Sequence, residues 1–224
     1  SGAGNDHLIT GKGIDIVDGG AGDDRWEADK SFATSAQVID IDLNETGVQL
    51  TYLGDATVRG IEMLTLKTGA AADTIETLAT VVANTSTHGH DDQIETNDGN
   101  DAVTVTGGRD LVAMGAGTDT LTIDWSLIGR SVGTYNVAGA GGVVLTGSLE
   151  EGYSGIYFGD DWRYYNYLGF SGVEHFVFRS GSGHDGIRTG DGNDTVISGA
   201  GNDHLITGKG IDIVDGGADT DRWE

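Results

Sequence analysis

Apolar and polar positions repeat along this chain with a period of nine residues. Aspartate recurs at every ninth position in three separate runs, and an apolar side chain stands two residues after each aspartate. The rule holds for all twelve aspartates of these runs: Asp6, Asp15, Asp24, Asp92, Asp101, Asp110, Asp119, Asp185, Asp194, Asp203, Asp212 and Asp221. Short apolar segments bounded by turn-forming residues are typical of β-strands with one buried face. The pattern therefore predicts a series of short strands, each entered from a tight turn.

Glycine is the second regular feature of these nonapeptides. It occupies the second and fourth positions in the clearest copies, such as TGDGNDTVI and SGAGNDHLI. Because glycine readily adopts positive φ angles, the first six residues of each copy can reverse the chain. Eighteen residues would then close one coil of two strands and two turns, with turns eighteen residues apart stacked on the same edge. We expect an all-β fold, a parallel β-roll of the β-helix or solenoid type that alternates with β-rich spacers.

These residues resemble the calcium-binding nonapeptide repeats of the RTX (repeats-in-toxin) family, written G-G-x-G-x-D-x-U-x. The clear motifs cover residues 1–27, 87–122 and 180–224. The parallel-strand spacing of about 4.8 Å would also place carboxylates from successive turns of one edge within reach of one hard cation. Turn carbonyls would complete the oxygen ligands that Ca²⁺ prefers. We therefore expect Ca²⁺ as the cofactor and the twelve aspartates as its metal ligands.

Some of these aspartates are better placed than others. Asp203 belongs to two pairs with eighteen-residue spacing and Asp6 to one, so loss of Asp203 should weaken calcium binding more. Binding should be weaker in the middle run, where Asn97 and Thr106 stand in place of turn glycines. Asp73, within TGAAADTIE, lacks the second turn glycine and is not counted among the ligands. Six complete pairs, which suggest about six ions or more, stand eighteen residues apart: Asp6 and Asp24, Asp92 and Asp110, Asp101 and Asp119, Asp185 and Asp203, Asp194 and Asp212, and Asp203 and Asp221.

Longer repeats divide the chain into segments. Residues 198–224 match residues 1–27 at 25 of 27 positions, an offset of 197, and a weaker half-repeat aligns GIEMLTLKTG at Gly60 with GVEHFVFRSG at Gly172. We expect a fragment of a giant tandem-repeat protein. Its expected segments are a β-roll end of three nonapeptides (1–27), a β-rich spacer (28–68), a partly degenerate β-roll (69–122), an aromatic β-rich spacer (123–179) and a β-roll of five nonapeptides (180–224). The spacers either continue the solenoid with wider coils or form small β layers packed on it.

The second spacer carries a cluster of aromatic residues. Between residues 153 and 170 they are Tyr153, Tyr157, Phe158, Trp162, Tyr164, Tyr165, Tyr167 and Phe170. Exposed rings beside Asp, Asn and Arg could stack on sugars, whereas buried rings would seal an open edge of the solenoid or a junction between repeats. We favour the second interpretation.

Composition excludes several classes of protein. The chain has 12 basic and 36 acidic residues, a net charge of −24, and no cysteine. Disulfide frameworks, iron–sulfur clusters and thiolate zinc sites are therefore excluded. The negative charge opposes binding to nucleic acid and to anionic membranes, and no apolar run is long enough to insert into one. The sequence shows no H-E-x-x-H or P-loop motif, and we do not expect an enzyme.

The resemblance implies type I secretion and folding on Ca²⁺ binding outside the cell. We expect an extracellular or cell-surface structural module, such as an adhesin stalk, a fibre or a surface-layer element. Its partners would be calcium and neighbouring repeats, with head-to-tail self-association of the chain. Two alternatives stay open: a polysaccharide-binding module that takes a neutral glycan at residues 153–170, and a secretion and folding domain of a larger RTX toxin or enzyme.

Overall fold

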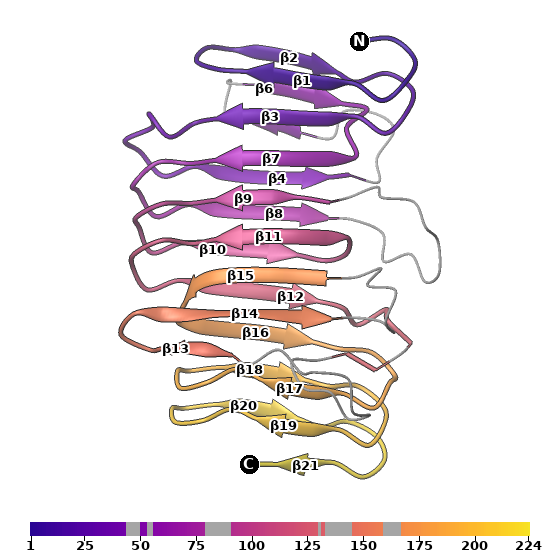
Figure 1. Cartoon of the computed structure of the whole chain (residues 1–224), viewed down its shortest axis with the longest axis vertical. Helices are drawn as coiled ribbons and strands as arrows, with labels where there is room; N and C mark the ends of the chain where they lie inside the picture. Colours follow the sequence, from indigo (N-terminus) through magenta and orange to yellow (C-terminus); the bar gives the residue numbers. More distant parts are fainter. Residues whose placement is uncertain (44–49, 53–55, 79–90, 130, 133–144, 159–166) are drawn as a thin grey trace.

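The chain folds into a stack of strands along one long axis, with its two ends at opposite ends of the stack (Figure 1). A computed structural model describes residues 1–43, 50–52, 56–78, 91–129, 131–132, 145–158 and 167–224. Every regular element within these ranges is a strand, which confirms the predicted all-β class. The described ranges accordingly offer no helix that could cross a membrane.

The strands of the first face run mostly parallel to one another. In spatial order they are β1 (His7–Thr10), β3 (Arg25–Asp29), β7 (Met63–Lys67), β9 (Gln93–Glu95), β11 (Arg109–Ala113), β15 (Tyr167–Val173), β14 (Gly152–Phe158) and β13 (Thr146–Ser148). A three-stranded sheet follows it toward the C-terminus: β17 (Gly186–Arg188), β19 (His204–Ile206) and β21 (Arg222–Trp223). β14 is antiparallel to both of its neighbours.

The second face is built in the same way. Its seven-stranded sheet has the order β20 (Ile213–Asp215), β18 (Thr195–Ile197), β16 (His175–Arg179), β12 (Thr120–Asp124), β10 (Ala102–Val105), β8 (Thr74–Leu78) and β4 (Val38–Asp42). A smaller sheet at the N-terminal end has the order β2 (Asp15–Asp18), β6 (Ala56–Arg59) and β5 (Leu50–Tyr52), of which β5 is antiparallel to β6.

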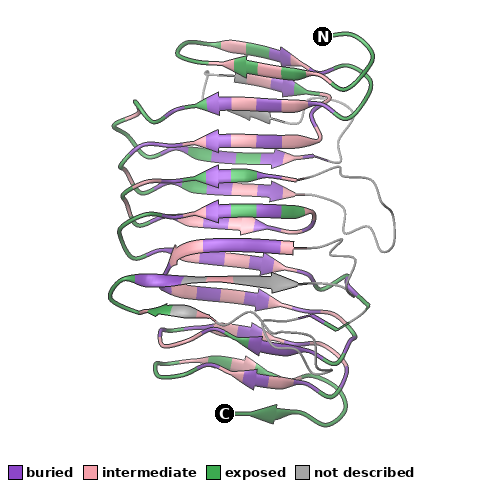
Figure 2. Cartoon of the chain, viewed as in Figure 1, coloured by how far each residue is buried: buried purple, intermediate pink, exposed green. Residues whose placement is uncertain are grey.

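Pairing in the nonapeptide runs follows the predicted coil length. His7 pairs with Arg25, Ala102 with Thr120, and Gly186 with His204, eighteen residues apart in each case. The apolar residue of each nonapeptide points between the two faces. Nine of the twelve are buried, two are partly buried, and Trp223 is exposed. Figure 2 shows these buried positions alternating with less buried ones along the strands.

The described parts of both spacers continue the solenoid. β7 lies between β3 and β9, and β16 lies between β12 and β18. The alternating apolar stretches AQVIDIDL, LTIDW and VEHFVF of the spacers form β4, β12 and β16. Residues 44–47, whose asparagine and glycine favour a turn after the first of these stretches, lie outside the described residues. Wider coils are therefore the arrangement that the structure favours over a separate β layer.

One coil of the first spacer does not follow chain order. From β3 the chain passes to β4, which pairs with β8. It then returns toward the N-terminal end, because β6 pairs with β2 and β5 lies between β6 and β4. From there it enters β7, which pairs with β3. Along the axis from the N-terminal end the order is therefore β2, β6, β5, β4 and β8, so β4 lies beyond β6 although it precedes β6 in the sequence.

The half-repeat places equivalent strands on opposite faces. β7 and β16 correspond at an offset of 112 residues, but β7 belongs to the first face and β16 to the second. The last residues of the two strands accept equivalent backbone hydrogen bonds. Lys67 O accepts from Lys30 N–H at 2.7 Å, and Arg179 O accepts from Trp125 N–H at 2.8 Å. Both halves of the chain therefore build the same wide coil.

Candidate metal centres

Aspartates precede the strands at both turn edges and form two columns along the stack. Each column is joined by a repeated hydrogen bond, in which the backbone N–H of one aspartate donates to Oδ1 of the aspartate in the next turn. All six pairs counted from the sequence are joined in this way: Asp6 to Asp24 at 2.7 Å, Asp92 to Asp110 at 3.1 Å, Asp101 to Asp119 at 2.8 Å, Asp185 to Asp203 at 2.8 Å, Asp194 to Asp212 at 3.1 Å and Asp203 to Asp221 at 3.1 Å.

Three acids that sequence reasoning did not count extend the columns through the spacers. Asp24 N–H donates to Glu62 Oε2, and Asp119 N–H donates to Glu174 Oε2, both at 2.7 Å. Asp73, which is buried, donates its N–H to Asp101 Oδ1 at 2.7 Å. The half-repeat contained a signal for the two glutamates, because each stands two residues after an aligned glycine.

The second carboxylate oxygen of these aspartates accepts no protein hydrogen bond, although Lys30 Nζ lies 3.7 Å from that of Asp15. Oδ2 is buried and without a hydrogen bond in nine of them: Asp15, Asp24, Asp73, Asp92, Asp101, Asp119, Asp185, Asp194 and Asp203. Leaving one buried polar atom unpaired costs about 1–3 kcal/mol, and more when the group is charged. A regular row of such atoms therefore points to cations as the missing partners.

Burial makes these carboxyl groups hard to ionise when no cation is bound. It raises the pKa of Asp119 to about 7 and that of Asp185 to about 6. It also raises the pKa of other carboxyl groups in the columns: Asp92, Asp101, Asp110, Asp194 and Asp203. The cause is the loss of water around the charged form, and the charge of Asp92 adds to the rise in the pKa of Asp110.

Glycines let successive turns approach closely. Gly201 has a φ of +135°, and a Cβ there would lie 1.8 Å from the carbonyl oxygen of Gly183 in the neighbouring turn. A Cβ on Gly19 would lie 2.7 Å from Asp24 Oδ2. A side chain at either position would push apart the carbonyl and carboxylate oxygens, so the turn glycines keep these oxygens close together.

The donor set fits calcium better than other metals. Nowhere in the described ranges do three His, Asp or Glu side chains converge as a metal site. A cation held between two turns would therefore combine carboxylates with backbone carbonyl oxygens. Such all-oxygen sites suit Ca²⁺, whereas transition metals prefer imidazole or thiolate ligands.

The predicted ligands near the two ends of the stack are less buried. Asp6, Asp15 and Asp212 are half-buried and Asp221 is exposed. Asp15 belongs to none of the six pairs, because residue 33, eighteen positions later, is alanine. Its Oδ2 lies 3.7 Å from Lys30 Nζ instead.

The described aromatic residues of the second spacer include two in the core. Tyr153 and Phe170 are buried, and the Tyr153 hydroxyl accepts a hydrogen bond from Asp191 N–H at 2.8 Å. Phe170 lies edge-on to Phe176, with ring centroids 5.3 Å apart. Trp162, Tyr164 and Tyr165 lie outside the described residues. Tyr153 of β14 and Phe170 of β15 therefore pack into the core of the stack.

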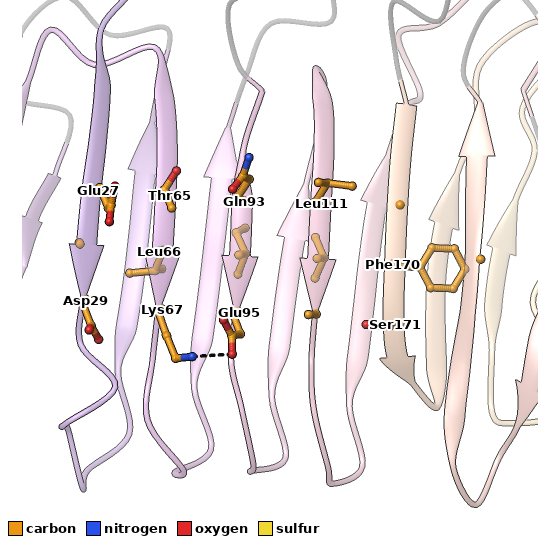
Figure 3. A pocket seen from close by; sticks show the side chains of 16 residues that line it. Glu27, Asp29, Thr65, Leu66, Lys67, Gln93, Glu95, Leu111, Phe170 and Ser171 are labelled. Atoms are coloured by element: carbon orange, nitrogen blue, oxygen red, sulfur yellow. Dashed lines mark hydrogen bonds and ion pairs between the residues drawn. The ribbon is translucent and has the colours of Figure 1, made fainter. Parts of the chain in front are cut away.

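A groove of about 540 Å³ crosses β3, β7, β9, β11 and β15 on the first face (Figure 3). Lys67 Nζ and Glu95 Oε1 form an ion pair in it at 2.6 Å, and Phe170 lies at one end. None of the column aspartates lines this groove. It is therefore separate from the candidate metal centres.

Comparison with protein-family models identifies the repeated turns. Four segments match the RTX calcium-binding nonapeptide repeat, at residues 1–25, 87–121, 177–205 and 188–222. This chain carries RTX calcium-binding repeats. The RTX segments include all twelve aspartates predicted from the sequence, whereas Glu62, Asp73 and Glu174 lie outside them. RTX repeats bind Ca²⁺ and are structural rather than catalytic. No curated protein matches the chain.

Proposed function

We propose that this chain is a calcium-rigidified structural module of a long secreted or cell-surface protein, such as an adhesin stalk, a fibre or a surface-layer element. The observation that carries the proposal is the row of buried Oδ2 atoms that accept no protein hydrogen bond, eight of them in aspartates other than Asp15. RTX repeat proteins are typically secreted, and this agrees with a module that needs extracellular calcium.

The proposed ligands are the aspartates of the RTX segments other than Asp15, whose Oδ2 lies beside Lys30 Nζ, together with Asp73, Glu62 and Glu174. In this scheme a Ca²⁺ ion between neighbouring turns binds carboxylate and carbonyl oxygens and neutralises the buried charge. An ion that binds only the folded form stabilises it by mass action. We expect about six ions or more, with affinities in the range of about 10⁻⁴ to 10⁻³ M that suits extracellular modules.

Tandem copies would extend the module. β19, β20 and β21 restate β1, β2 and β3 at an offset of 197 residues. The indole N–H groups of Trp26 and Trp223 donate to Thr10 and Thr207, both at 3.0 Å, so the two copies share a side-chain contact as well. We propose that neighbouring repeats continue one solenoid across their junction and that isolated chains associate head to tail.

Removal of calcium tests the proposal. Millimolar EDTA should abolish most of the β-sheet signal in circular dichroism, and millimolar Ca²⁺ should restore it, because the buried carboxylates then regain their partner. Mg²⁺ at the same concentration is the control, and it should restore less because it demands tighter octahedral geometry. An unchanged spectrum in chelator would contradict the proposal.

A further inference from the structure

Lys30 is a buried cation at the N-terminal end of one aspartate column. It follows β3, and its side chain is only 6 % exposed. Its Nζ lies 3.7 Å from Asp15 Oδ2 and donates to the carbonyl oxygen of Gly11 at 3.4 Å. Lysine is seldom buried to this degree unless it is paired with an opposite charge.

The two oxygen atoms nearest the Lys30 ammonium are of the types that bind calcium. One is the second carboxylate oxygen of a column aspartate, and the other is a turn carbonyl. These are the donor types that a Ca²⁺ ion would use elsewhere in the columns. Eighteen residues after Asp15 stands Ala33, so Asp15 has no partner of the kind that joins the six pairs.

The backbone of this turn does not require a lysine. In the second half of the chain Trp125 occupies the equivalent position, because Ile128 N–H donates to Trp125 O as Ala33 N–H donates to Lys30 O, both at 2.9 Å. Trp125 is fully buried and packs edge-on against Phe178 at 5.8 Å. The same turn therefore accepts an uncharged aromatic ring, and the charge of Lys30 needs an explanation of its own.

We propose that the Lys30 ammonium is a built-in cation that takes the place of calcium beside Asp15. This inference rests on the proposed calcium-binding role of the columns. A divalent ion at Asp15 would lie within a few ångströms of the ammonium and be repelled by it. Asp15 therefore carries the RTX motif but binds no Ca²⁺, and one end of the column is neutralised whatever the calcium concentration.

The number of bound ions tests the inference. Equilibrium dialysis with ⁴⁵Ca²⁺ at saturating concentration would compare the wild-type chain with Asp15→Asn and Lys30→Met. Asp15→Asn should bind as many ions as the wild type, whereas Asp194→Asn, in a column turn without lysine, should bind fewer. Lys30→Met should bind one ion more, because it leaves the Asp15 carboxylate without its partner.

Controls separate this inference from the proposed function. Lys12→Met removes an exposed lysine nearby, whose Nζ lies over the Phe32 ring at 4.8 Å, and should leave the ion count unchanged. Loss of an ion in Asp15→Asn, or an unchanged count in folded Lys30→Met, would overturn the inference. If Lys30→Met does not fold, Asp15→Asn alone decides. A wild-type chain that binds no calcium would instead refute the proposed function.

Discussion

At the residue scale, each linked aspartate uses its two carboxylate oxygens differently. Asp203 is 2 % exposed, and its Oδ1 accepts from Asp185 N–H while its own N–H donates to Asp221. Its Oδ2 lies buried without a protein partner. Asp101 is linked in the same way to Asp73 and Asp119. A place inside a column, rather than membership of the C-terminal run, therefore gives an aspartate two links.

Substitution of an inner aspartate should cost more than substitution of an outer one. Asp203→Ala and Asp101→Ala remove a proposed ligand and also leave a buried N–H without its acceptor, which costs about 1–3 kcal/mol. Asp6 is half-buried, and its carboxylate accepts only from the Ser1 hydroxyl. The calcium concentration at half-maximal folding, followed by circular dichroism, should rise more for the two inner variants than for Asp6→Ala. Equal calcium midpoints for the inner and outer variants would show that the position of an aspartate in its column does not affect calcium-dependent folding.

Asp219 is a non-glycine residue with a positive φ in the last turn of the chain. Its φ is +82°, a conformation that costs a residue with a Cβ about 1–2 kcal/mol. The earlier copy of this turn has Gly22 at the same position. Asp219→Gly should therefore stabilise the calcium-loaded chain by about 1 kcal/mol in urea unfolding.

Ala218→Gly is the matched control for Asp219→Gly. Ala218 does not have a positive φ, so glycine at this position relieves no strain in the folded chain. It raises the conformational entropy of the unfolded chain and should therefore lower the free energy of unfolding. A loss of stability in Asp219→Gly would instead mean that the Asp219 carboxylate binds an ion.

At the scale of strands and columns, the sequence predicted the regular parts and missed the irregular ones. The nine-residue period is sufficient for the strands of the RTX segments, because each coil there closes in eighteen residues. It could not show that Glu62 follows Asp24 in a column, since 38 residues separate them. Asp73 and Asp101 are neighbours across 28 residues. Hydrogen bonding needs proximity in space only, so a segment of any length can intervene between two neighbouring turns.

The columns should make folding depend on pH in a direction set by burial. Asp119 and Asp185 have folded-state pKa values of about 7 and about 6, above the ordinary 3.8. Groups with raised values stabilise the fold when protonated, so this contribution is complete below about pH 4 and is lost as the pH rises through about 6 to 7. In calcium-free buffer the β-sheet signal in circular dichroism should therefore be larger at pH 5 than at pH 8.

Saturating calcium should reverse this pH order, because Ca²⁺ binds the deprotonated carboxylates and competes with protons. A β-sheet signal that grows from pH 5 to pH 8 in calcium-free buffer would mean that the column carboxylates are solvated in the folded chain.

At the scale of the whole molecule, the stack defines the length of one repeat. β2 and β20 are copies of one strand, and nine steps between neighbouring strands of the second face separate them. At about 4.8 Å a step, the long repeat advances by about 43 Å. A chain lengthened by one further repeat of 197 residues should show a maximum dimension greater by about this amount in small-angle X-ray scattering with calcium.

The chain with a single long repeat is the control for that measurement. An increase of less than half the expected length would mean that successive repeats fold back on each other. Such a result would contradict a continuous solenoid without affecting the calcium sites themselves.

The detour of the first spacer has a mechanical consequence. A simple roll pulled by its ends would unwind one coil at a time, like thread from a spool. Here β4 pairs with β8, while β5 and β6, which follow it in the chain, lie between it and β2. Once a pulling force from the N-terminal end has detached β3, it acts on β4. β4 can detach only if its contacts with both β8 and β5 break. We therefore expect the coils between β2 and β8 to unfold together under force, rather than one after another.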